Sequence, residues 1–176
     1  FCISVLTDFE FFGGKMEFLT EVKEHVSVPV LRKDFIIDEY QLLEAKAIGA
    51  DVILLIAACL EPNRLFELAK FAKSLGLSVL MEVHDLAELE RSISPDLDAI
   101  GVNNRNLKTF DVSIQTSLDL VEKIPNDFVK ISESGLSEPA VLKELKTAGY
   151  EGFLMGEAFM KTPNPGETMS VLVDQL

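Results

Sequence analysis

Short apolar segments alternate with segments of helical periodicity along the whole chain, and this alternation limits the possible folds more than any other feature. The strand-like segments are nearly free of polar residues, as is typical of parallel strands buried on both faces. They are Ile3–Leu6, Val30–Arg32, Val52–Ile56, Ser78–Met81, Ala99–Val102, Val129–Ser132 and Gly152–Met155. A strand begins about every 25 residues with no linker or shift in composition between them, so we predict a single domain over residues 1–176.

The segments between these strands have the features of helices. Within Glu61–Leu75 one stripe at helical spacing contains only apolar residues, namely Leu65, Leu68, Ala69, Ala72 and Leu75. Three glycines, Gly49, Gly76 and Gly149, follow such segments at positions where glycine commonly ends a helix. The C-terminal segment Pro165–Leu176 suits a last helix.

Strict alternation of strands and helices leaves two architectures, an open doubly wound sheet and a closed (β/α)8 TIM barrel. A doubly wound sheet usually carries a glycine-rich phosphate turn after an early strand, and this sequence has none. Seven strand–helix units fill the chain, whereas eight would need roughly 200 residues. We therefore expect an α/β fold, a (β/α)8 barrel with seven of its eight units present and the N-terminal unit missing. Because an open barrel exposes two strand edges, we expect an N-terminal segment or self-association to close it.

The net charge and the length of the apolar runs exclude several classes of partner. The chain has 16 Lys and Arg against 29 Asp and Glu, a formal net charge of −13. Nucleic acids and anionic membrane surfaces attract positively charged proteins, so we expect neither as a partner. The longest apolar run, Val52–Leu60, is too short to span a bilayer.

Cys2 and Cys59 lie far apart in apolar surroundings, and we interpret them as buried, reduced thiols of a cytoplasmic protein.

Polar residues gather directly after the predicted strands, at the end where parallel barrels bind their substrates. Lys33, Glu82 and Glu133 follow the second, fourth and sixth strands. The apolar neighbours Val30, Leu31 and Phe35 predict that Lys33 is partly buried, and a partly buried lysine can act as a general acid near neutral pH. Two carboxylates beside it would form a cluster suited to proton transfer. Asn103 and Arg105 follow the fifth strand and have the chemistry to orient a hydroxyl or a carboxylate. The alternative for Lys33 is a solvated surface charge, and the alternative for Glu82 and Glu133 is a structural ion pair. For Asn103–Asn106 the alternative is an Asn-rich turn.

Two glycine turns follow the last two strands, Ser134-Gly135 and Gly156-Glu157. Loops at these positions of a barrel often bind phosphate through backbone N–H groups, and glycine lets the backbone approach the anion closely. Backbone donors would allow an acidic protein to bind a phosphorylated small molecule. The alternative is that both are simple turns.

A metal site has little support. Glu82, His84 and Asp85 follow one another closely, but no second cluster of ligands accompanies them. We therefore expect no metal at these residues.

Five motifs, in order and at matching spacings, resemble those of the indole-3-glycerol phosphate synthase family. They are Leu31-Arg32-Lys33-Asp34-Phe35, Met81-Glu82-Val83, Gly101-Val102-Asn103-Asn104-Arg105-Asn106-Leu107, Ser132-Glu133-Ser134-Gly135 and Phe153-Leu154-Met155-Gly156-Glu157. The resemblance extends over essentially the whole chain. It implies a cofactor-free lyase of tryptophan biosynthesis that converts 1-(2-carboxyphenylamino)-1-deoxyribulose 5-phosphate into indole-3-glycerol phosphate, carbon dioxide and water.

The resemblance also implies catalytic roles. Lys33 is the general acid that protonates the ribulose carbonyl during ring closure, and Glu82 takes part in the later proton transfer and dehydration. Asn103 and Glu133 orient the substrate and the lysine, with Arg105 supporting this polar network.

Substrate-binding roles follow from the same resemblance. The phosphate-binding residues are Ser134, Gly135, Gly156 and Glu157, and the wall around the anthranilate ring contains Phe35 and Leu55.

The sequence departs from the family's pattern at its start. The family's first strand carries a Glu and a Lys that contact the substrate, and this chain begins at the equivalent of the second strand. Two alternatives therefore stay open. One is a barrel fragment that binds the phosphorylated ligand without turnover. The other is a different phosphate-binding barrel such as phosphoribosylanthranilate isomerase, whose Cys–Asp pair is not matched by Cys2 or Cys59.

Overall fold

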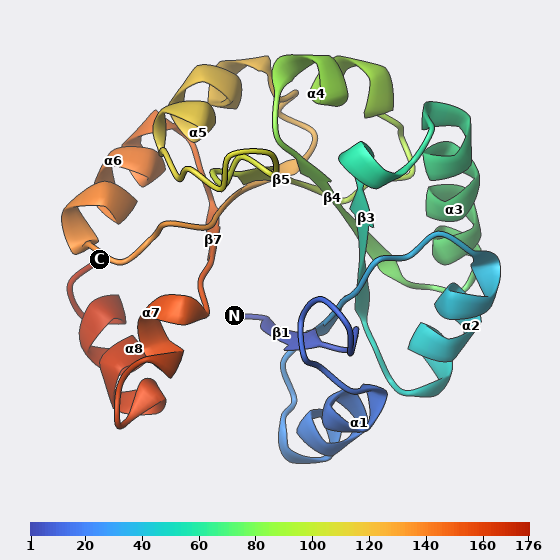
Figure 1. Ribbon diagram of the computed structural model, residues 1–176, viewed down its shortest axis with the longest axis horizontal. Helices are drawn as coiled ribbons and strands as arrows, with labels where there is room; N and C mark the ends of the chain where they lie inside the picture. Colours follow the sequence, from blue (N-terminus) through green and yellow to red (C-terminus); the bar gives the residue numbers. More distant parts are fainter. The chain divides into compact units, whose positions relative to one another are not determined.

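The computed structural model describes residues 1–176, and the chain divides into two compact units. The first unit contains Phe1–Val83 and Ala87–Ala99, and the second contains His84–Leu86 and Ile100–Leu176. Strands and helices alternate through both units, so the predicted alternation is confirmed (Figure 1).

The first unit holds four parallel strands, which lie side by side in sequence order. The strands are β1 (Ile3–Leu6), β2 (Val30–Lys33), β3 (Val52–Ile56) and β4 (Ser78–Val83). The helices are α1 (Met16–His25), α2 (Glu39–Ala47), α3 (Pro62–Ser74) and α4 (Leu86–Ser92), and a short 3-10 helix, η1 (Ala57–Cys59), follows β3. In Figure 1, α1, α2 and α3 lie along one face of these strands.

The second unit holds the other three strands, again in sequence order. They are β5 (Ala99–Asn103), β6 (Val129–Glu133) and β7 (Gly152–Leu154), with β6 and β7 parallel. The helical elements are α5 (Gln115–Leu120), the 3-10 helix η2 (Val121–Lys123), α6 (Pro139–Ala148), α7 (Glu157–Met160) and α8 (Pro165–Val173).

All seven predicted strands are present, with ends shifted by at most two residues. Four of them extend further toward their carboxyl ends than the apolar pattern predicts, and these extensions take in Lys33, Glu82, Asn103 and Glu133. The reason is that backbone pairing continues past the last apolar side chain, as when Leu6 pairs with Lys33 and Ile56 with Glu82. The predicted site residues therefore lie on strands rather than in loops.

The predicted helix features are also confirmed. Four residues of the predicted stripe on α3 are fully buried, namely Leu65, Leu68, Ala69 and Ala72. Gly49, Gly76 and Gly149 have φ angles of 93°, 71° and 121°, which side chains disfavour. The last helix ends at Val173, three residues earlier than predicted.

The prediction that both cysteines are buried is wrong. Cys2 and Cys59 are free thiols, as expected, but both are exposed. Cys2 precedes β1 and Cys59 ends the 3-10 helix after β3, so neither lies within a strand covered on both faces.

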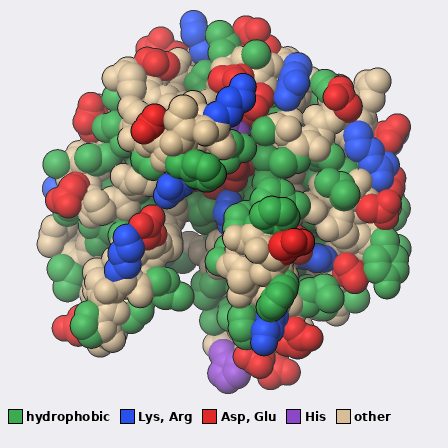
Figure 2. Space-filling view, viewed as in Figure 1, with side chains coloured by type: hydrophobic (Ala, Val, Ile, Leu, Met, Phe, Trp, Pro, Cys, Tyr) green, Lys and Arg blue, Asp and Glu red, His purple; other side chains and the backbone are tan.

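The surface charge and the length of the helices both bear on the expected partners. Acidic side chains are scattered among basic ones over the face shown in Figure 2, in keeping with the net charge of −13. Among the helices, none has the length and apolar character needed to cross a bilayer.

Candidate active site

Lys33 and Glu82 form an ion pair at the carboxyl ends of β2 and β4. Lys33 Nζ lies 3.1 Å from Glu82 Oε2, and the two side chains are 17% and 5% exposed. Neighbouring residues of a strand point to opposite faces. Since Arg32 contacts helix α2, Lys33 points to the face away from the helices. The structure thus confirms the expected partial burial of Lys33 and places a carboxylate directly against it.

A shielded lysine–carboxylate pair is suited to proton transfer. In such surroundings the ammonium and the carboxylate interact more strongly than they would in water, and a proton passes between them over one hydrogen bond. The negative charge of Glu82 also affects the pKa of a nearby thiol, that of Cys59. Partial desolvation raises the pKa of the thiol of Cys59, an exposed residue, and the negative charges of Glu82 and Glu88 raise it further.

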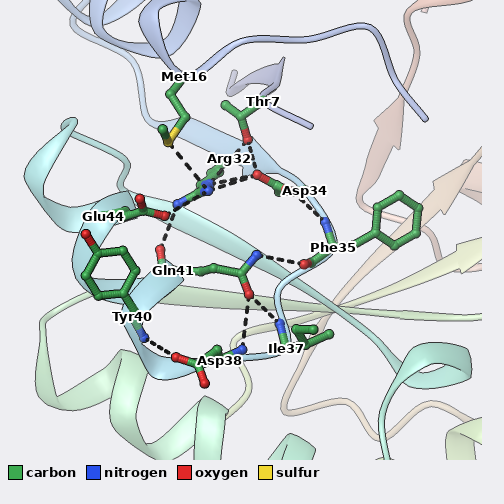
Figure 3. Close-up of polar contacts among 10 residues, drawn as sticks. All are labelled: Thr7, Met16, Arg32, Asp34, Phe35, Ile37, Asp38, Tyr40, Gln41 and Glu44. Carbon is green, nitrogen blue, oxygen red and sulfur yellow. Dashed lines mark hydrogen bonds and ion pairs between the residues drawn. The ribbon is translucent and has the colours of Figure 1, made fainter. Parts of the chain in front are cut away.

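A buried polar cluster on the opposite face of β2 holds the strand in place (Figure 3). Its centre is Arg32, which is 3% exposed. The Arg32 guanidinium donates to Asp34 Oδ2 from Nε at 3.1 Å and from Nη2 at 2.9 Å, and to the Gln41 carbonyl oxygen at 2.7 Å. Thr7 Oγ1 donates to the same Asp34 oxygen at 2.7 Å, and Glu44 lies 3.6 Å from Nη2. The cluster therefore links the end of β1, β2 and α2 around the residue next to Lys33.

The same cluster fixes the loop between β2 and α2. Asp34 Oδ1 accepts from the Phe35 N–H at 2.8 Å, and Gln41 Nε2 donates to the Phe35 carbonyl oxygen at 2.9 Å. Gln41 Oε1 accepts from the backbone N–H of Ile37 and of Asp38, which caps α2. Both polar groups of the Phe35 backbone are therefore fixed, and its ring is held just beyond Lys33.

Three aromatic rings meet at this end of the first unit. The Phe12 ring is stacked on Phe35 with centroids 4.9 Å apart, and the Phe11 ring meets Phe35 edge-on at 5.4 Å. Of these three rings, only Phe35 was predicted from the sequence. The available signal was a group of three phenylalanines, Phe9, Phe11 and Phe12, in the loop that follows β1. Leu55, the other residue expected at an apolar wall, is fully buried in β3.

In the second unit, the carboxyl ends of β5 and β6 carry Asn103 and Glu133. Glu133 is 2% exposed, and Asn103 Oδ1 accepts from the Arg105 N–H at 3.0 Å. Asn104 and Ser132, the residues next to them, contact Ser117 of α5. By strand alternation, Asn103 and Glu133 therefore point away from the helices.

The two predicted glycine turns differ. Ser134 and Gly135 both have left-handed backbones, with φ of 68° and 70°. A Cβ on Gly135 would lie 2.2 Å from Val112 Cγ1, so glycine is required there, whereas a Cβ on Gly156 would meet nothing within 4 Å. The Glu157 carboxylate pairs with Lys161 and lies 3.5 Å from Arg105. The hydrogen bond from Lys161, followed by the charges of Lys161 and Arg105, holds the pKa of Glu157 below its usual range.

Comparison with known proteins identifies the family. The indole-3-glycerol phosphate synthase family model matches residues 1–172. The chain belongs to this family. Similar curated members are the indole-3-glycerol phosphate synthases of Bacteroides thetaiotaomicron, 53% identical over 95% of this chain, and of Acidovorax sp. (strain JS42), 49% identical over 97%. The chain spans 64% of the length of each of these relatives.

Solved structures of other enzymes share the fold. The 3-hexulose-6-phosphate synthase of Salmonella typhimurium superimposes with a TM-score of 0.78 at 16% identity, covering 99% of this chain and 88% of that one. Orotidine 5'-phosphate decarboxylase from Pyrococcus horikoshii OT3 gives a TM-score of 0.74 at 14% identity, covering 99% and 86%. This member of the indole-3-glycerol phosphate synthase family therefore has an α/β barrel-type fold.

Within this family member, the predicted site residues fall into two groups. The first unit holds Lys33, Glu82, Phe35 and Leu55, and the second holds Asn103, Arg105, Glu133, Ser134, Gly135, Gly156 and Glu157. His84 and Asp85 follow β4, and no group of three or more His, Cys, Asp and Glu side chains is arranged to hold a metal ion. Arg32 and Asn104, two polar residues that lie behind the strands, belong to the family motifs, but the sequence predicted no function for them.

Proposed function

We propose that this chain carries indole-3-glycerol phosphate synthase activity, with 1-(2-carboxyphenylamino)-1-deoxyribulose 5-phosphate as its substrate. The observation that carries the proposal is the shielded Lys33–Glu82 pair, with its 3.1 Å contact, at the strand ends of a chain that belongs to this family. We also propose that the two units are parts of one (β/α)8 barrel domain that acts in the cytoplasm. The fold of the solved neighbours and the free thiols support this.

Ring closure is the step assigned to Lys33. The aromatic carbon that bears the carboxylate attacks the ribulose carbonyl carbon, and the ammonium gives a proton to the carbonyl oxygen as its negative charge develops. Carbon dioxide then leaves, and the electrons of the broken bond restore the aromatic ring. Glu82 is close enough to Lys33 to return a proton over one hydrogen bond.

Dehydration completes the product. The new hydroxyl leaves as water, and the adjacent CH2 group loses a proton, which forms the double bond of the indole. We assign Glu82 to this proton transfer, in line with the family resemblance. Its 5% exposed side chain keeps bulk water from competing for the proton.

Orientation and phosphate binding are assigned to residues of the second unit. In the proposal Asn103 and Glu133 orient the reacting groups, and Arg105 supports Asn103 through their 3.0 Å hydrogen bond. The phosphate is held at the Ser134-Gly135 turn and, following the resemblance, at Gly156-Glu157. The Glu157 carboxylate is paired with Lys161, so its contribution would come from the backbone N–H.

The apolar wall of the site is assigned to Phe35, with Leu55 beneath the surface of the same unit. The stacking of Phe12 on Phe35 supports a flat, aromatic binding surface next to the general acid. An anthranilate ring stacked there would bring its reacting carbon toward the strand end that carries Lys33.

Kinetics with the substrate, followed by the fluorescence of the indole product, test the proposal. Lys33→Met removes the proton donor, and we expect kcat to fall by about 10²–10⁴-fold. The matched control is Lys73→Met. Lys73 also pairs with a carboxylate, Asp98 at 2.7 Å, but lies on α3 away from the predicted site. A chain without turnover, or equal activity in both variants, would refute the assignment.

A further inference from the structure

A closed group of buried polar side chains lies behind the Ser134-Gly135 turn. It consists of Asn104, directly after β5, Ser117 of α5, Ser132 of β6 and Tyr150, two residues before the start of β7. None of the four is more than 2% exposed. Polar groups are buried at a cost unless each finds a partner, so the arrangement of these hydrogen bonds is informative.

The direction of every hydrogen bond around Asn104 is determined. The Ser117 backbone N–H can only donate, and it lies 3.2 Å from Asn104 Oδ1. The Ser134 carbonyl oxygen can only accept, and it lies 3.1 Å from Asn104 Nδ2. The amide therefore has one possible orientation, with its oxygen toward α5 and its nitrogen toward the turn.

The remaining bonds close a ring. Asn104 Nδ2 donates its second hydrogen to Ser132 Oγ at 3.0 Å, and Ser117 Oγ donates to Asn104 Oδ1 at 2.8 Å. Ser132 Oγ must then donate to Ser117 Oγ, which lies at 2.8 Å. Tyr150 Oη donates to the Ser117 carbonyl oxygen at 2.8 Å. Both hydrogens and both lone pairs of the Asn104 amide are used, so no other side chain of this size could replace it.

The Ser134 carbonyl that Asn104 contacts belongs to a turn with an uncommon backbone conformation. Ser134 is one of two non-glycine residues with positive φ in the chain, and Gly135 continues the left-handed conformation. A side chain disfavours this region, so Ser134 needs an external contact to stay in it. Neither the Ser134 N–H nor the Gly135 N–H donates to a backbone carbonyl or to a side chain of the protein. The turn thus keeps two backbone donors available while its carbonyl oxygen is fixed from behind.

We propose that Asn104 is a positioning residue for phosphate binding. Its amide nitrogen holds the Ser134 carbonyl oxygen, keeps Ser134 in the left-handed conformation, and so presents the N–H groups of Ser134 and Gly135 to the anion. This inference rests on the proposed phosphate site at the same turn. The inference adds that Asn104 preorganises the turn for binding, and that it does so without contacting the phosphate.

Titration of the ¹⁵N-labelled chain with inorganic phosphate tests this role without requiring catalysis. Amide resonances are followed by NMR, with chloride added to a parallel sample to match the ionic strength. In the wild-type chain the resonances of Ser134 and Gly135 are expected to shift with phosphate. In Asn104→Ala the dissociation constant for phosphate is expected to rise about tenfold, because a hydrogen bond that holds the turn is lost.

Tyr150→Phe is the matched control. It removes one hydrogen bond from the same buried group but does not touch Ser134, so it is expected to lower stability while leaving phosphate binding unchanged. If Asn104→Ala does not fold, Asn104→Asp serves instead. It retains an acceptor for the Ser117 N–H and offers at most one hydrogen to the two acceptors on the side of the turn.

The outcomes separate this inference from the proposed function. Equal phosphate affinity in wild-type and Asn104 variants would overturn the positioning role and leave the phosphate site intact. An equal loss in Tyr150→Phe would also overturn it, since Asn104 would then act only through stability. If the wild-type resonances of Ser134 and Gly135 do not shift when phosphate is added, the proposal that this turn binds phosphate is refuted. The Lys33 kinetics would remain an independent test of the reaction.

Discussion

Replacing Arg32 by methionine removes the centre of the buried cluster behind β2. The substitution keeps most of the apolar volume of the side chain but loses its five N–H donors. Asp34 is the partner most affected. Its carboxylate is 9% exposed and accepts two hydrogen bonds from Arg32, at 3.1 and 2.9 Å. Arg32→Met would leave this charge buried with only the Thr7 hydroxyl and the Phe35 N–H as donors.

The expected loss of stability follows from the burial of this pair. Removing one partner of a buried ion pair typically costs about 3–5 kcal/mol, mainly because the other charge stays behind without compensation. Two donors to Asp34 remain, so we expect Arg32→Met to lower the free energy of unfolding by about 3 kcal/mol. Adding Asp34→Asn removes the stranded charge and should recover part of the loss, which identifies that charge as the cause.

Urea unfolding monitored by far-UV circular dichroism measures these changes, since the chain has no tryptophan to serve as a fluorescent probe. Arg64→Met is the matched control. Arg64 makes two contacts with Glu39, at 2.7 and 2.6 Å, closer than those of Arg32, but its side chain is 31% exposed. We expect a much smaller loss there, because solvent screens exposed ion pairs. If the two arginine variants lose equal stability, burial is not what makes the Arg32 cluster strong.

Three further predictions follow from other contacts. Burial acts to raise the pKa of the Asp51 carboxyl, but hydrogen bonds from Lys23 and a backbone N–H, with nearby lysine charges, hold it below its ordinary value. The ionised Asp51 carboxylate therefore stabilises the fold at neutral pH, and this contribution is lost on acidification. In acid titrations followed by circular dichroism, the stability of Asp51→Asn should fall less steeply below about pH 4 than that of the wild-type chain. Gly14→Ala would place a Cβ 2.1 Å from the Leu6 carbonyl oxygen, and its melting temperature should fall far more than that of Gly13→Ala, where a Cβ meets nothing within 4 Å. Cys2 and Cys59 are exposed residues, but the surrounding chain partly desolvates their thiols and so raises the pKa of each. Native protein should therefore react completely with a maleimide, and more slowly than free glutathione does at neutral pH.

Much of the fold was predictable because strands such as β3 and β4 are buried on both faces. A segment such as Val52–Ile56 carries its own signal, since every residue in it must be apolar, and its boundaries match the structure. The carboxyl ends of the strands were less predictable. Pairing there continues through polar residues such as Lys33 and Glu133, which the apolar pattern cannot distinguish from loop residues.

The candidate site was predictable only in part, for a related reason. Lys33 and Glu82 stand out as polar residues at strand ends, and the structure brings them into contact. Their neighbours Arg32 and Asn104 look equally polar in the sequence. Strand alternation turns them toward the helices, where they form buried networks instead of facing a ligand. Which of two adjacent polar residues faces which way depends on the pairing of the strand.

The sequence by itself determined the order of strands and helices, the family, and the residue types available at each strand end, because these depend on local periodicity and on motifs within a few residues. Tertiary structure alone decided the contacts. It brought Lys33 against Glu82, 49 positions apart, and Asn104 against Ser134, 30 positions apart. It also exposed two cysteines whose apolar neighbours suggested burial. The physical reason is that burial and hydrogen bonding depend on which distant segments pack together, and this information is spread over the whole chain rather than held in any one motif.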